Sequence, residues 1–375
     1  MSCARMQSGA AAILASAVLA CGAPPTAESP DVVRPQLALS AAATVEVVMS
    51  GLASPRGLAF GPEGALYVVE SGTNTRNGGC VDYLEGSTPA VRCYSGTGGV
   101  SRWWKGAQTR VISGLPSTYI VGSGFAAGPQ AISFVGRGNG MVAMGWGGDP
   151  DLRAILGGPA AILGTLIQLH PRGGYRVVAD VAAYESQANP GGGLADSNPN
   201  GVLAEGNRTY VVDAGGNSLV EVGANGAISL VTTFPATPAP APFMSAEAVP
   251  TRVRRGPDGA LYVSTLSGVP FMDGSAKIYR VVPGQAPTPY LEGFKAITDF
   301  AFGADGSVYV VQFATGFLFF PSPGVLIRVA PNGVRTTLVS NLFHPTGIAI
   351  GADGAIYVSN RGTSSVAGEV LRIVP

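Results

Sequence analysis

The sequence is poor in the residues on which most enzymes and nucleic-acid-binding proteins depend. Among 375 residues there are two histidines, four cysteines and 12% charged residues, and the formal net charge is zero. Sparse, balanced charge argues against nucleic acid or an anionic membrane surface as a partner recognised through charge alone. The scarcity of His and Cys leaves no patterned His/Cys metal site. Glycine (54) and proline (29) are abundant instead, which suits many short strands joined by turns.

Residues 1–20 predict a secretory signal peptide. The apolar run from Ala10 to Ala20 is too short to span a bilayer and ends in Val18-Leu19-Ala20-Cys21. A Cys directly after a small residue resembles a lipoprotein signal, which predicts lipidation of Cys21 and attachment to a membrane through that lipid. The expected location is then the periplasmic side of an outer membrane or the cell surface. Ordinary signal cleavage, giving a soluble secreted protein, is the alternative.

Residues 21–43 are rich in Pro, Ala and Ser and are predicted to be a flexible tether to a domain spanning 44–375. That domain keeps two cysteines, Cys80 and Cys93. An exported protein meets an oxidising compartment, so these two are predicted to form a disulfide. A metal site is the weaker interpretation, because no His or further Cys lies nearby.

One eight-residue stretch occurs four times in nearly the same form. The copies are Gly61-Pro62-Glu63-Gly64-Ala65-Leu66-Tyr67-Val68 and its counterparts at 256–263, 303–310 and 351–358. In each, an acidic residue and Gly make a tight corner, and alternating β-branched and aromatic residues then make a strand. A short apolar run precedes each corner, so the unit is a hairpin. A hairpin repeated at long intervals indicates a repeat architecture.

Counting strands predicts an all-β, six-bladed β-propeller of four-stranded antiparallel blades. Two degenerate hairpins bring the hairpins to six; six third strands follow them, but only five fourth strands. The missing strand is Val45 to Leu52, which resembles Thr337 to Leu342 and would complete the last blade, closing the ring. The turns at one end are tight. The long connections at the other end, here called the long-loop face, are where binding is expected: 70–97, 145–163, 181–200, 234–250, 266–275 and 313–323.

Several motifs together resemble the ScyD/ScyE family, secreted proteins first named from pigment gene clusters. They are Pro55 to Val68, the Cys80/Cys93 loop, Gly147-Gly148-Asp149-Pro150, Asp196-Ser197-Asn198-Pro199 and Asp213-Ala214-Gly215-Gly216-Asn217. The resemblance runs from about Val45 to Pro375, and single blades also resemble NHL repeats. It implies a six-bladed propeller but supplies no defined reaction.

The residues at which first strands begin are expected to converge on the mouth of a central channel; they are Arg56, Gln130, Asn200, Thr251, Asp299 and Thr346. Oxygen ligands converging in one place suit a hard cation such as Ca²⁺, and the candidates are Glu70, Asn200, Asp213 and Asp299. The alternative is that these short acids hydrogen-bond the backbone of nearby loops. Further ligand contacts are predicted at Arg56, Gln130, Thr251, Thr346, Asn360, Trp146 and Asp149. No catalytic residue is assigned, since His170 and His344 are expected to be structural.

The main functional hypothesis is an exported binding or scaffold module that uses its long-loop face to hold an unknown small molecule or protein. The alternative is a Ca²⁺-dependent hydrolase similar to lactonases and esterases, with its site at the channel mouth, an analogy at the level of the fold. A quinone-type dehydrogenase is a weaker third hypothesis, because the His expected by resemblance to those enzymes has no counterpart. No cofactor other than Ca²⁺ and no nucleic acid are expected, and the protein is expected to be a monomer.

Overall fold

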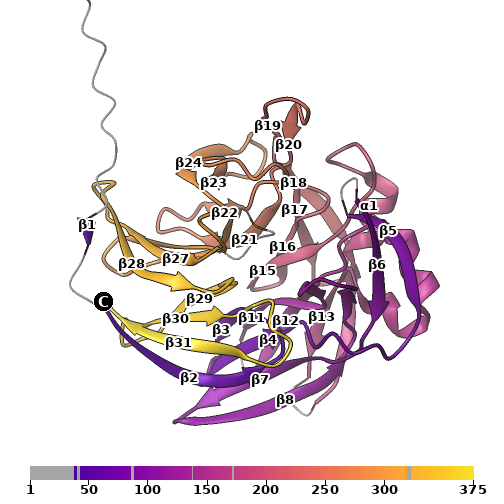
Figure 1. Cartoon of the computed structure of the whole chain (residues 1–375), viewed down its shortest axis with the longest axis horizontal. Helices are drawn as coiled ribbons and strands as arrows, with labels where there is room; N and C mark the ends of the chain where they lie inside the picture. Colours follow the sequence, from indigo (N-terminus) through magenta and orange to yellow (C-terminus); the bar gives the residue numbers. More distant parts are fainter. Residues whose placement is uncertain are drawn as a thin grey trace, which may run out of the picture. The chain divides into compact units, whose positions relative to one another are not determined.

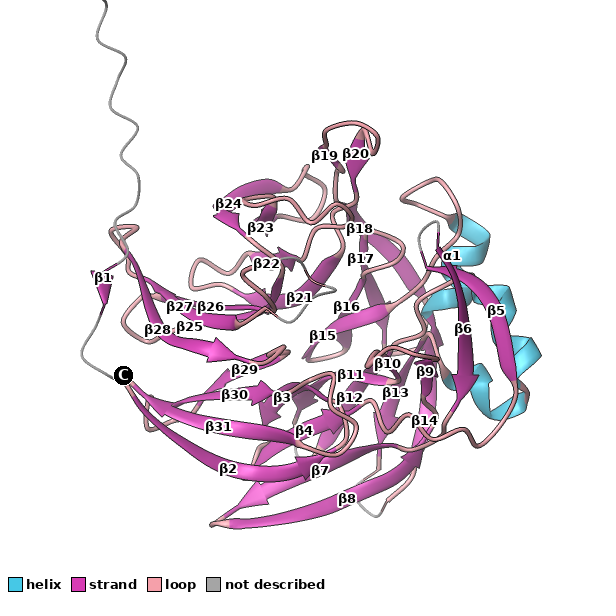
Figure 2. Ribbon diagram, in the orientation of Figure 1, coloured by secondary structure: helices cyan, strands magenta, loops and turns pink. Residues whose placement is uncertain are grey.

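The computed structural model of the chain describes residues 38–39, 43–85, 88–136, 138–170, 173–316, 318 and 322–375. The predicted signal peptide and Cys21 lie outside the described residues, as does most of the predicted tether. The described part is all-β apart from three short helices, which lie beside β5 and β6 (Figure 2). Within it, no helix is long and apolar enough to cross a membrane.

Four-stranded antiparallel sheets follow one another along the chain (Figure 1), so this predicted pattern is confirmed. Numbered in chain order, sheets 1 to 3 contain β3 (Pro55–Phe60), β4 (Leu66–Glu70), β7 (Gly98–Trp104) and β8 (Ala107–Leu115); β11 (Pro129–Val135), β12 (Asn139–Met144), β13 (Thr165–Leu169) and β14 (Tyr175–Asp180); and β15 (Pro199–Glu205), β16 (Arg208–Asp213), β17 (Ser218–Gly223) and β18 (Ile228–Thr233).

Sheets 4 and 5 continue the pattern with β21 (Pro250–Arg255), β22 (Leu261–Thr265), β23 (Ala276–Val281) and β24 (Thr288–Phe294), and then β25 (Ile297–Phe302), β26 (Val308–Gln312), β27 (Gly324–Val329) and β28 (Arg335–Leu342). Sheet 6 takes its outer strand from the other end of the described chain. It contains β29 (Gly347–Ile350), β30 (Ile356–Asn360), β31 (Gly368–Val374) and β2 (Thr44–Leu52), with Val45 opposite Ile373 and Leu52 opposite Gly368.

Two residues assigned to the tether belong to a sheet. Ala38–Leu39 form β1, which pairs in parallel with β28 opposite Thr336 and Thr337. The free edge of an outer strand has unpaired backbone N–H and C=O groups, and another segment of the chain can form hydrogen bonds with them.

The long connections carry structure that the sequence did not predict. β5 (Cys80–Glu85), β6 (Thr88–Tyr94), β9 (Thr118–Ile120) and β10 (Ala126–Ala127) make an additional antiparallel sheet, in which the Cys80–Cys93 disulfide joins β5 to β6. The other connections contain η1 (Pro150–Leu156), η2 (Gly158–Ile162), α1 (Val181–Ala188) and the hairpin of β19 (Thr237–Pro238) and β20 (Ser245–Ala246).

The repeated corners explain why the same residues recur. Gly259 has φ +77°, a conformation that side chains disfavour, and Asp258 accepts a hydrogen bond from the N–H of Ala260. Asp258 also pairs with Arg280 on the third strand of the same sheet at 2.7 Å. Asp305 pairs with Arg328, and Asp353 with Arg372, in the same way. Each acidic corner thus fastens a hairpin to the strand beside it.

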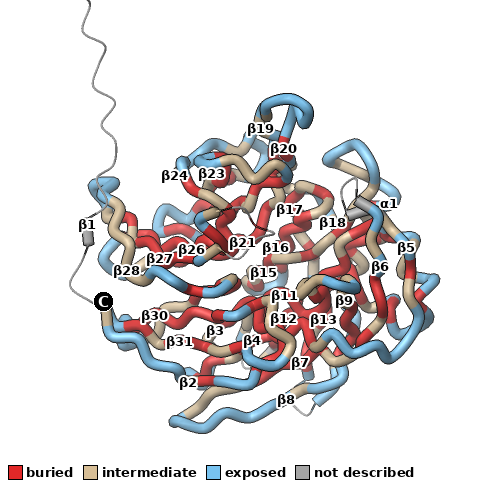
Figure 3. The backbone as a smooth tube through the Cα atoms, in the orientation of Figure 1, coloured by how far each residue is buried: buried red, intermediate tan, exposed pale blue. Residues whose placement is uncertain are grey.

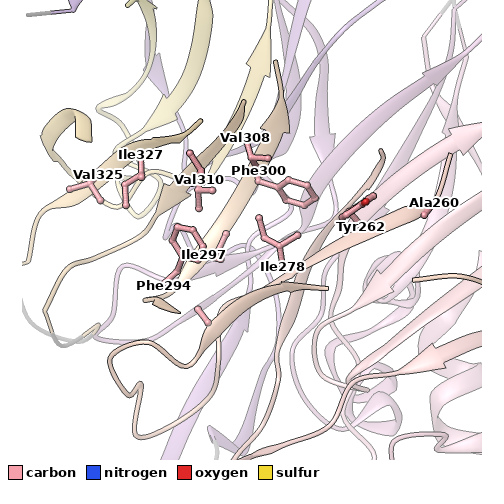
Figure 4. Packing of buried hydrophobic residues seen from close by; sticks show 12 residues of the cluster. Ala260, Tyr262, Ile278, Phe294, Ile297, Phe300, Val308, Val310, Val325 and Ile327 are labelled. Carbon is pink, nitrogen blue, oxygen red and sulfur yellow. The ribbon is translucent and has the colours of Figure 1, made fainter. Parts of the chain in front are cut away.

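Burial follows strand order within each sheet (Figure 3). The first four residues of β3 are buried, whereas most of the outer strand β8 is exposed. Six apolar clusters each take residues from two sheets. One joins sheets 4 and 5 through Ile278, Phe300 and Val310 (Figure 4), and another joins sheets 6 and 1 through Tyr357 and Leu66. The core therefore lies between the faces of successive sheets, where apolar burial stabilises their stacking.

Candidate functional site

A cavity of about 220 Å³ opens where the first strands of the sheets begin. Residues at or next to strand starts form its polar floor: Arg56, Gln130, Asn200, Thr251, Arg252, Thr298 and Thr346. Residues farther out along the connections form its walls, which are largely apolar: Ile120, Phe125, Trp146, Leu266, Phe313 and Leu318, with Arg92, Gly147 and Asn198 among them. This cavity is called the pocket below. No Asp or Glu lines it within the described part of the chain.

Six of the predicted ligand-contact and metal candidates line the pocket: Arg56, Gln130, Asn200, Thr251, Thr346 and Trp146. Two others do not. The side chain of Asn360 is held by the N–H of Phe343 and by Glu369. Asp149 caps η1 by accepting the N–H of Asp151.

The threonines of the floor fasten neighbouring sheets together. The hydroxyl of Thr251 donates to the carbonyl of Ile297 at 3.0 Å. The hydroxyl of Thr298 donates to the carbonyl of Pro345 at 2.9 Å. The hydroxyl of Thr346 donates to the carbonyl of Pro55 at 2.7 Å. Because these donors are occupied, the threonines shape the floor more than they recognise a ligand.

Arg252 occupies the centre of the floor and links sheets that are far apart in sequence. From sheet 4, its guanidinium donates to the carbonyls of Gln130 (3.2 Å) and Thr346 (3.1 Å) and to both oxygens of Asn200. Its Nε lies 3.4 Å from Asp299. Burial lowers the pKa of Arg252, a loss that Asp299 partly offsets.

Asp299 is therefore a partner of arginines and does not face the pocket. It accepts hydrogen bonds from Arg254 (2.8 Å), Arg252, the N–H of Phe300 and the N–H of Ile348, and it is fully buried. The predicted alignment was one residue out, because Thr298 takes the strand-start position. One carboxylate is shared by two guanidinium groups, so the floor keeps a net positive charge.

Arg56 adds a second buried cation. It donates to the carbonyls of Gly362 and Ala126, both at 2.7 Å, and to the hydroxyl of Ser71. Within the described residues its guanidinium forms no ion pair. Burial, and then the charge of Arg252, lower the pKa of Arg56 to about 10, so it stays charged at neutral pH. A buried cation held only by neutral groups favours an anion beside it.

Arg92 supplies the third cation, from the hairpin that the disulfide closes. Its guanidinium lies 4.6 Å from the ring centroid of Tyr83 and 5.3 Å from that of Trp146. It also donates to the hydroxyls of Tyr83 and Thr118. Trp146, a predicted ligand contact, is almost fully buried, and its indole N–H donates to the carbonyl of Asp149. It therefore acts as a wall and as the cation–π partner of Arg92.

The four metal candidates do not form one ligand set. Glu70 accepts from the N–H of Ala53, the hydroxyl of Ser101 and Arg110, which holds it within sheet 1. Asp213 accepts hydrogen bonds from the N–H groups of Gly215 and Gly216 in its own loop, as the alternative interpretation expected. Arg252 donates a hydrogen bond to Asn200 and forms an ion pair with Asp299. The described part of the chain contains no group of three or more His, Cys, Asp or Glu that could hold a metal ion.

His344 lies near the pocket without lining it. Its ring stacks on Phe313 with centroids 4.3 Å apart, and Nδ1 lies 2.7 Å from the hydroxyl of Thr363. Burial and the nearby charge of Arg56 lower its pKa, so the imidazole is neutral at pH 7.

Sequence reasoning missed Arg92, Asn198, Arg252 and Thr298. One signal could have found Thr298. Pro55, Pro129, Pro199, Pro250 and Pro345 each stand directly before a strand-start residue. Ile297 takes the place of that Pro in sheet 5, which aligns Thr298, and not Asp299, with the others. No comparable signal in the sequence marks Arg92, because its place depends on how β5 and β6 fold over the pocket.

No family model matches the sequence, and a search of curated proteins gave no match either. Solved structures do match. A protein of unknown function from Bacteroides thetaiotaomicron has a TM-score of 0.53 at 10% identity, covering 89% of this chain and 76% of that one. A protein from Thermus thermophilus, whose description proposes an oxidoreductase (glucose dehydrogenase), has a TM-score of 0.52 at 16% identity, covering 88% and 100%.

A third match is a protein whose description proposes a gluconolactonase. Its TM-score is 0.52 at 12% identity, covering 90% of this chain and 93% of that one. At these identities the likeness shows the fold alone. The chain is thus an all-β protein of four-stranded antiparallel sheets whose structural neighbours are β-propellers.

Proposed function

We propose that this chain is a binding module that holds a small amphipathic anion in the pocket of a closed six-bladed β-propeller. One observation carries the proposal. Three arginines line the pocket, Arg56, Arg92 and Arg252, while no carboxylate does so within the described residues. Such a lining attracts an acid and excludes cations.

The ring of six blades is part of the proposal and rests on packing. Six apolar clusters connect six sheets in pairs, and one of them joins sheet 6 to sheet 1. Pairing of β2 with β31 ties the two ends of the chain into one sheet. A closed ring leaves no sheet edge at the start or end of the series. Membership of the ScyD/ScyE family, export and lipidation of Cys21 complete the proposal.

The arrangement of the lining orients the ligand. The guanidinium groups of Arg56 and Arg252 belong to the floor, and the apolar side chains of Phe125, Phe313 and Leu318 belong to the walls. An acid group is therefore directed to the floor and an apolar body to the walls. A cavity of roughly 150 Å³ accepts a benzene ring, so about 220 Å³ suits one aromatic ring with a short acid side chain.

Within the described residues, the side chain of Gln130 makes no hydrogen bond, and the side-chain oxygen Oδ1 of Asn198 is buried without a partner. These amides are available to polar groups on the ligand.

A second candidate is a cation-dependent hydrolase acting on a lactone or ester. Its support is the likeness in fold to a neighbour whose description proposes a gluconolactonase. Arg56 and Arg252 would then stabilise the negative charge that develops on a carbonyl oxygen. The predicted Ca²⁺ ligands Glu70, Asp213 and Asp299 are each engaged by neighbouring groups, so this candidate requires them to release those partners on binding the ion.

Isothermal titration of the full chain with a panel of aromatic and aliphatic monocarboxylates tests the proposal. Losing a charge-assisted hydrogen bond costs about 1.5–3 kcal/mol, or roughly 10- to 150-fold in affinity. Arg56→Gln is expected to weaken binding by that factor. The matched control is Arg255→Gln, an exposed arginine that pairs with Glu205 outside the pocket, and it is expected to bind normally.

Equal affinity in Arg56→Gln and wild type, or no binding of any acid, would overturn the proposal. The second candidate has its own readout, which is Ca²⁺-dependent and chelator-sensitive acid release from lactones in a pH-stat.

A further inference from the structure

A buried carboxyl group of unusual environment lies behind one wall of the pocket. Glu185 on α1 is 2% exposed, and within the described residues its carboxyl group makes no hydrogen bond or ion pair. A buried carboxylate without a partner is costly, so the group favours its neutral form. Neither the predicted site nor the proposed ligand contacts include it.

Three carboxyl groups surround two adjacent glycines. A Cβ added to Gly216 would lie 2.5 Å from Oε2 of Glu185 and 3.4 Å from Cγ of Asp213. A Cβ added to Gly215 would lie 2.5 Å from Oδ1 of Asp196. The absence of side chains at 215 and 216 is what lets these acids approach one another.

Asp213 is the member of this group that holds the pocket wall. It accepts hydrogen bonds from the hydroxyl of Ser197 and the N–H of Asn198, both at 2.6 Å, and from the N–H groups of Gly215 and Gly216. Burial raises the pKa of Asp213, and these four hydrogen bonds, which favour its ionised form, oppose part of that rise. Through these hydrogen bonds Asp213 positions Ser197 and Asn198.

The same segment connects to Trp146. The N–H of Gly147 donates to the carbonyl of Ser197, and the N–H of Ser197 donates to the carbonyl of Gly148. The N–H of Gly148 in turn donates to Asp196. Trp146, Gly147 and Asn198 all line the pocket. A change in the charge of these three acids is therefore passed to this wall of the pocket directly through the hydrogen bonds of Asp213 and Asp196.

We propose that ionisation of Glu185 loosens this wall, so that the pocket holds its anion when Glu185 is protonated and releases it when Glu185 is charged. The proposal rests on the proposed function only for the ligand; the movement of the wall does not depend on it. A charged Glu185 would place a third negative group beside Asp213 and Asp196, and the repulsion is relieved when the loop of Gly215 and Gly216 moves away from Ser197 and Asn198.

Among the described residues, no cation forms an ion pair with Glu185 that would cancel that charge. Of the charged groups on the elements packed against α1, Arg153 is paired with Asp180 at 3.0 Å, and Asp151 accepts from Ser186. Burial, then Asp213, then Asp196 raise the pKa of Glu185 to about 7. The transition is therefore expected near neutral pH.

Trp146 fluorescence reports the wall without any ligand. In a Trp103→Phe/Trp104→Phe chain, Trp146 is the remaining tryptophan, and its emission is expected to change between pH 5.5 and 8.5 with a midpoint near 7. Glu185→Gln mimics the protonated acid and is expected to give a flat profile at the acid-side value. Asp196→Asn removes one neighbouring charge and is expected to move the midpoint to lower pH. His344→Gln is the control for the other titrating group near the pocket and is expected to leave the transition in place.

A transition that persists in Glu185→Gln, or a flat wild-type profile, would overturn the proposal. Binding supplies a second arm, with 3-phenylpropionate as the probe. Its affinity is expected to fall by up to tenfold per pH unit above the midpoint in wild type and to stay constant in Glu185→Gln. If 3-phenylpropionate and other acids do not bind at any pH, the proposed function fails, while the fluorescence result still decides the role of Glu185.

Discussion

The buried ion-pair network beneath the pocket gives the sharpest prediction, and Asp299→Asn is the change that probes it. Asp299 is fully buried and is the carboxylate partner of Arg252, which is 4% exposed, and of Arg254, which is 24% exposed. The amide keeps the size of the side chain but removes the charge that both guanidinium groups share. It also turns N–H donors towards them.

Removing one partner of a buried ion pair typically costs about 3–5 kcal/mol, because the other charge is left uncompensated. Asp299 also accepts the N–H groups of Phe300 and Ile348, so sheets 5 and 6 lose a shared acceptor. We expect the free energy of unfolding to fall by about 3–5 kcal/mol. Equilibrium unfolding in guanidinium chloride at pH 7, followed by circular dichroism, measures it.

Asp258→Asn is the matched control, since Asp258 and Arg280 form an exposed pair whose side chains are each 39% accessible. Its loss is expected to stay below about 1 kcal/mol. Equal losses in Asp258→Asn and Asp299→Asn would refute the reasoning. The same experiment tests the Ca²⁺ hypothesis, because Asp299 as a metal ligand would make the wild-type midpoint rise with added Ca²⁺ and fall with chelator, whereas an arginine partner predicts no change.

Three further predictions concern the sheets and the pocket wall. Thr346→Val leaves the buried carbonyl of Pro55 without its donor and is expected to lower the free energy of unfolding by about 1–3 kcal/mol in the same denaturation assay; a neutral result would remove the role given to the floor threonines. The double variant Cys80→Ser/Cys93→Ser removes the disulfide, whose cysteines are 13 residues apart in sequence. It is expected to lower the free energy of unfolding by up to about 3 kcal/mol and to weaken acid binding, because the hairpin carries Arg92. Unchanged affinity in calorimetry would show that the hairpin does not contribute to the site. Hydrogen bonds from Arg328 first, and then from Ser307, lower the pKa of Asp305 from its usual 3.8 to about 2. The stabilisation that follows is present above pH 3.8 and is lost as the pH falls through about 2. Asp305→Asn is therefore expected to flatten the acid limb of a stability–pH curve, by less than about 1 kcal/mol because the pair is exposed.

The sheets were predictable because their determinants are local. Each acidic residue followed by Gly forms a turn, and the alternating apolar residues after it form a strand. Residues such as Asp258 and Gly259 therefore predict a hairpin from the sequence alone. The pairing of β2 with β31 was predictable for a different reason: Val45 to Leu52 resembles the fourth strands and has no earlier sheet to join.

The site was predictable only in part, because its chemistry depends on contacts between distant segments. Strand starts led to Arg56, Gln130 and Thr346, which do line the pocket. The sequence could not show that Asp299 pairs with Arg252, because the two residues are 47 positions apart and come together only when sheets 4 and 5 pack. Because this arginine partner could not be predicted, the acid at a strand start was interpreted as a ligand for a cation.

Affinity for a matched acid and amide tests the central claim most directly. 3-Phenylpropionate and 3-phenylpropanamide have nearly the same size and apolar body and differ in charge. Calorimetry at pH 6 on the full chain is expected to show the acid binding at least tenfold more tightly than the amide, and Arg56→Gln is expected to remove most of that preference. Equal binding of acid and amide by wild type would contradict recognition of an anion by the three arginines of the pocket.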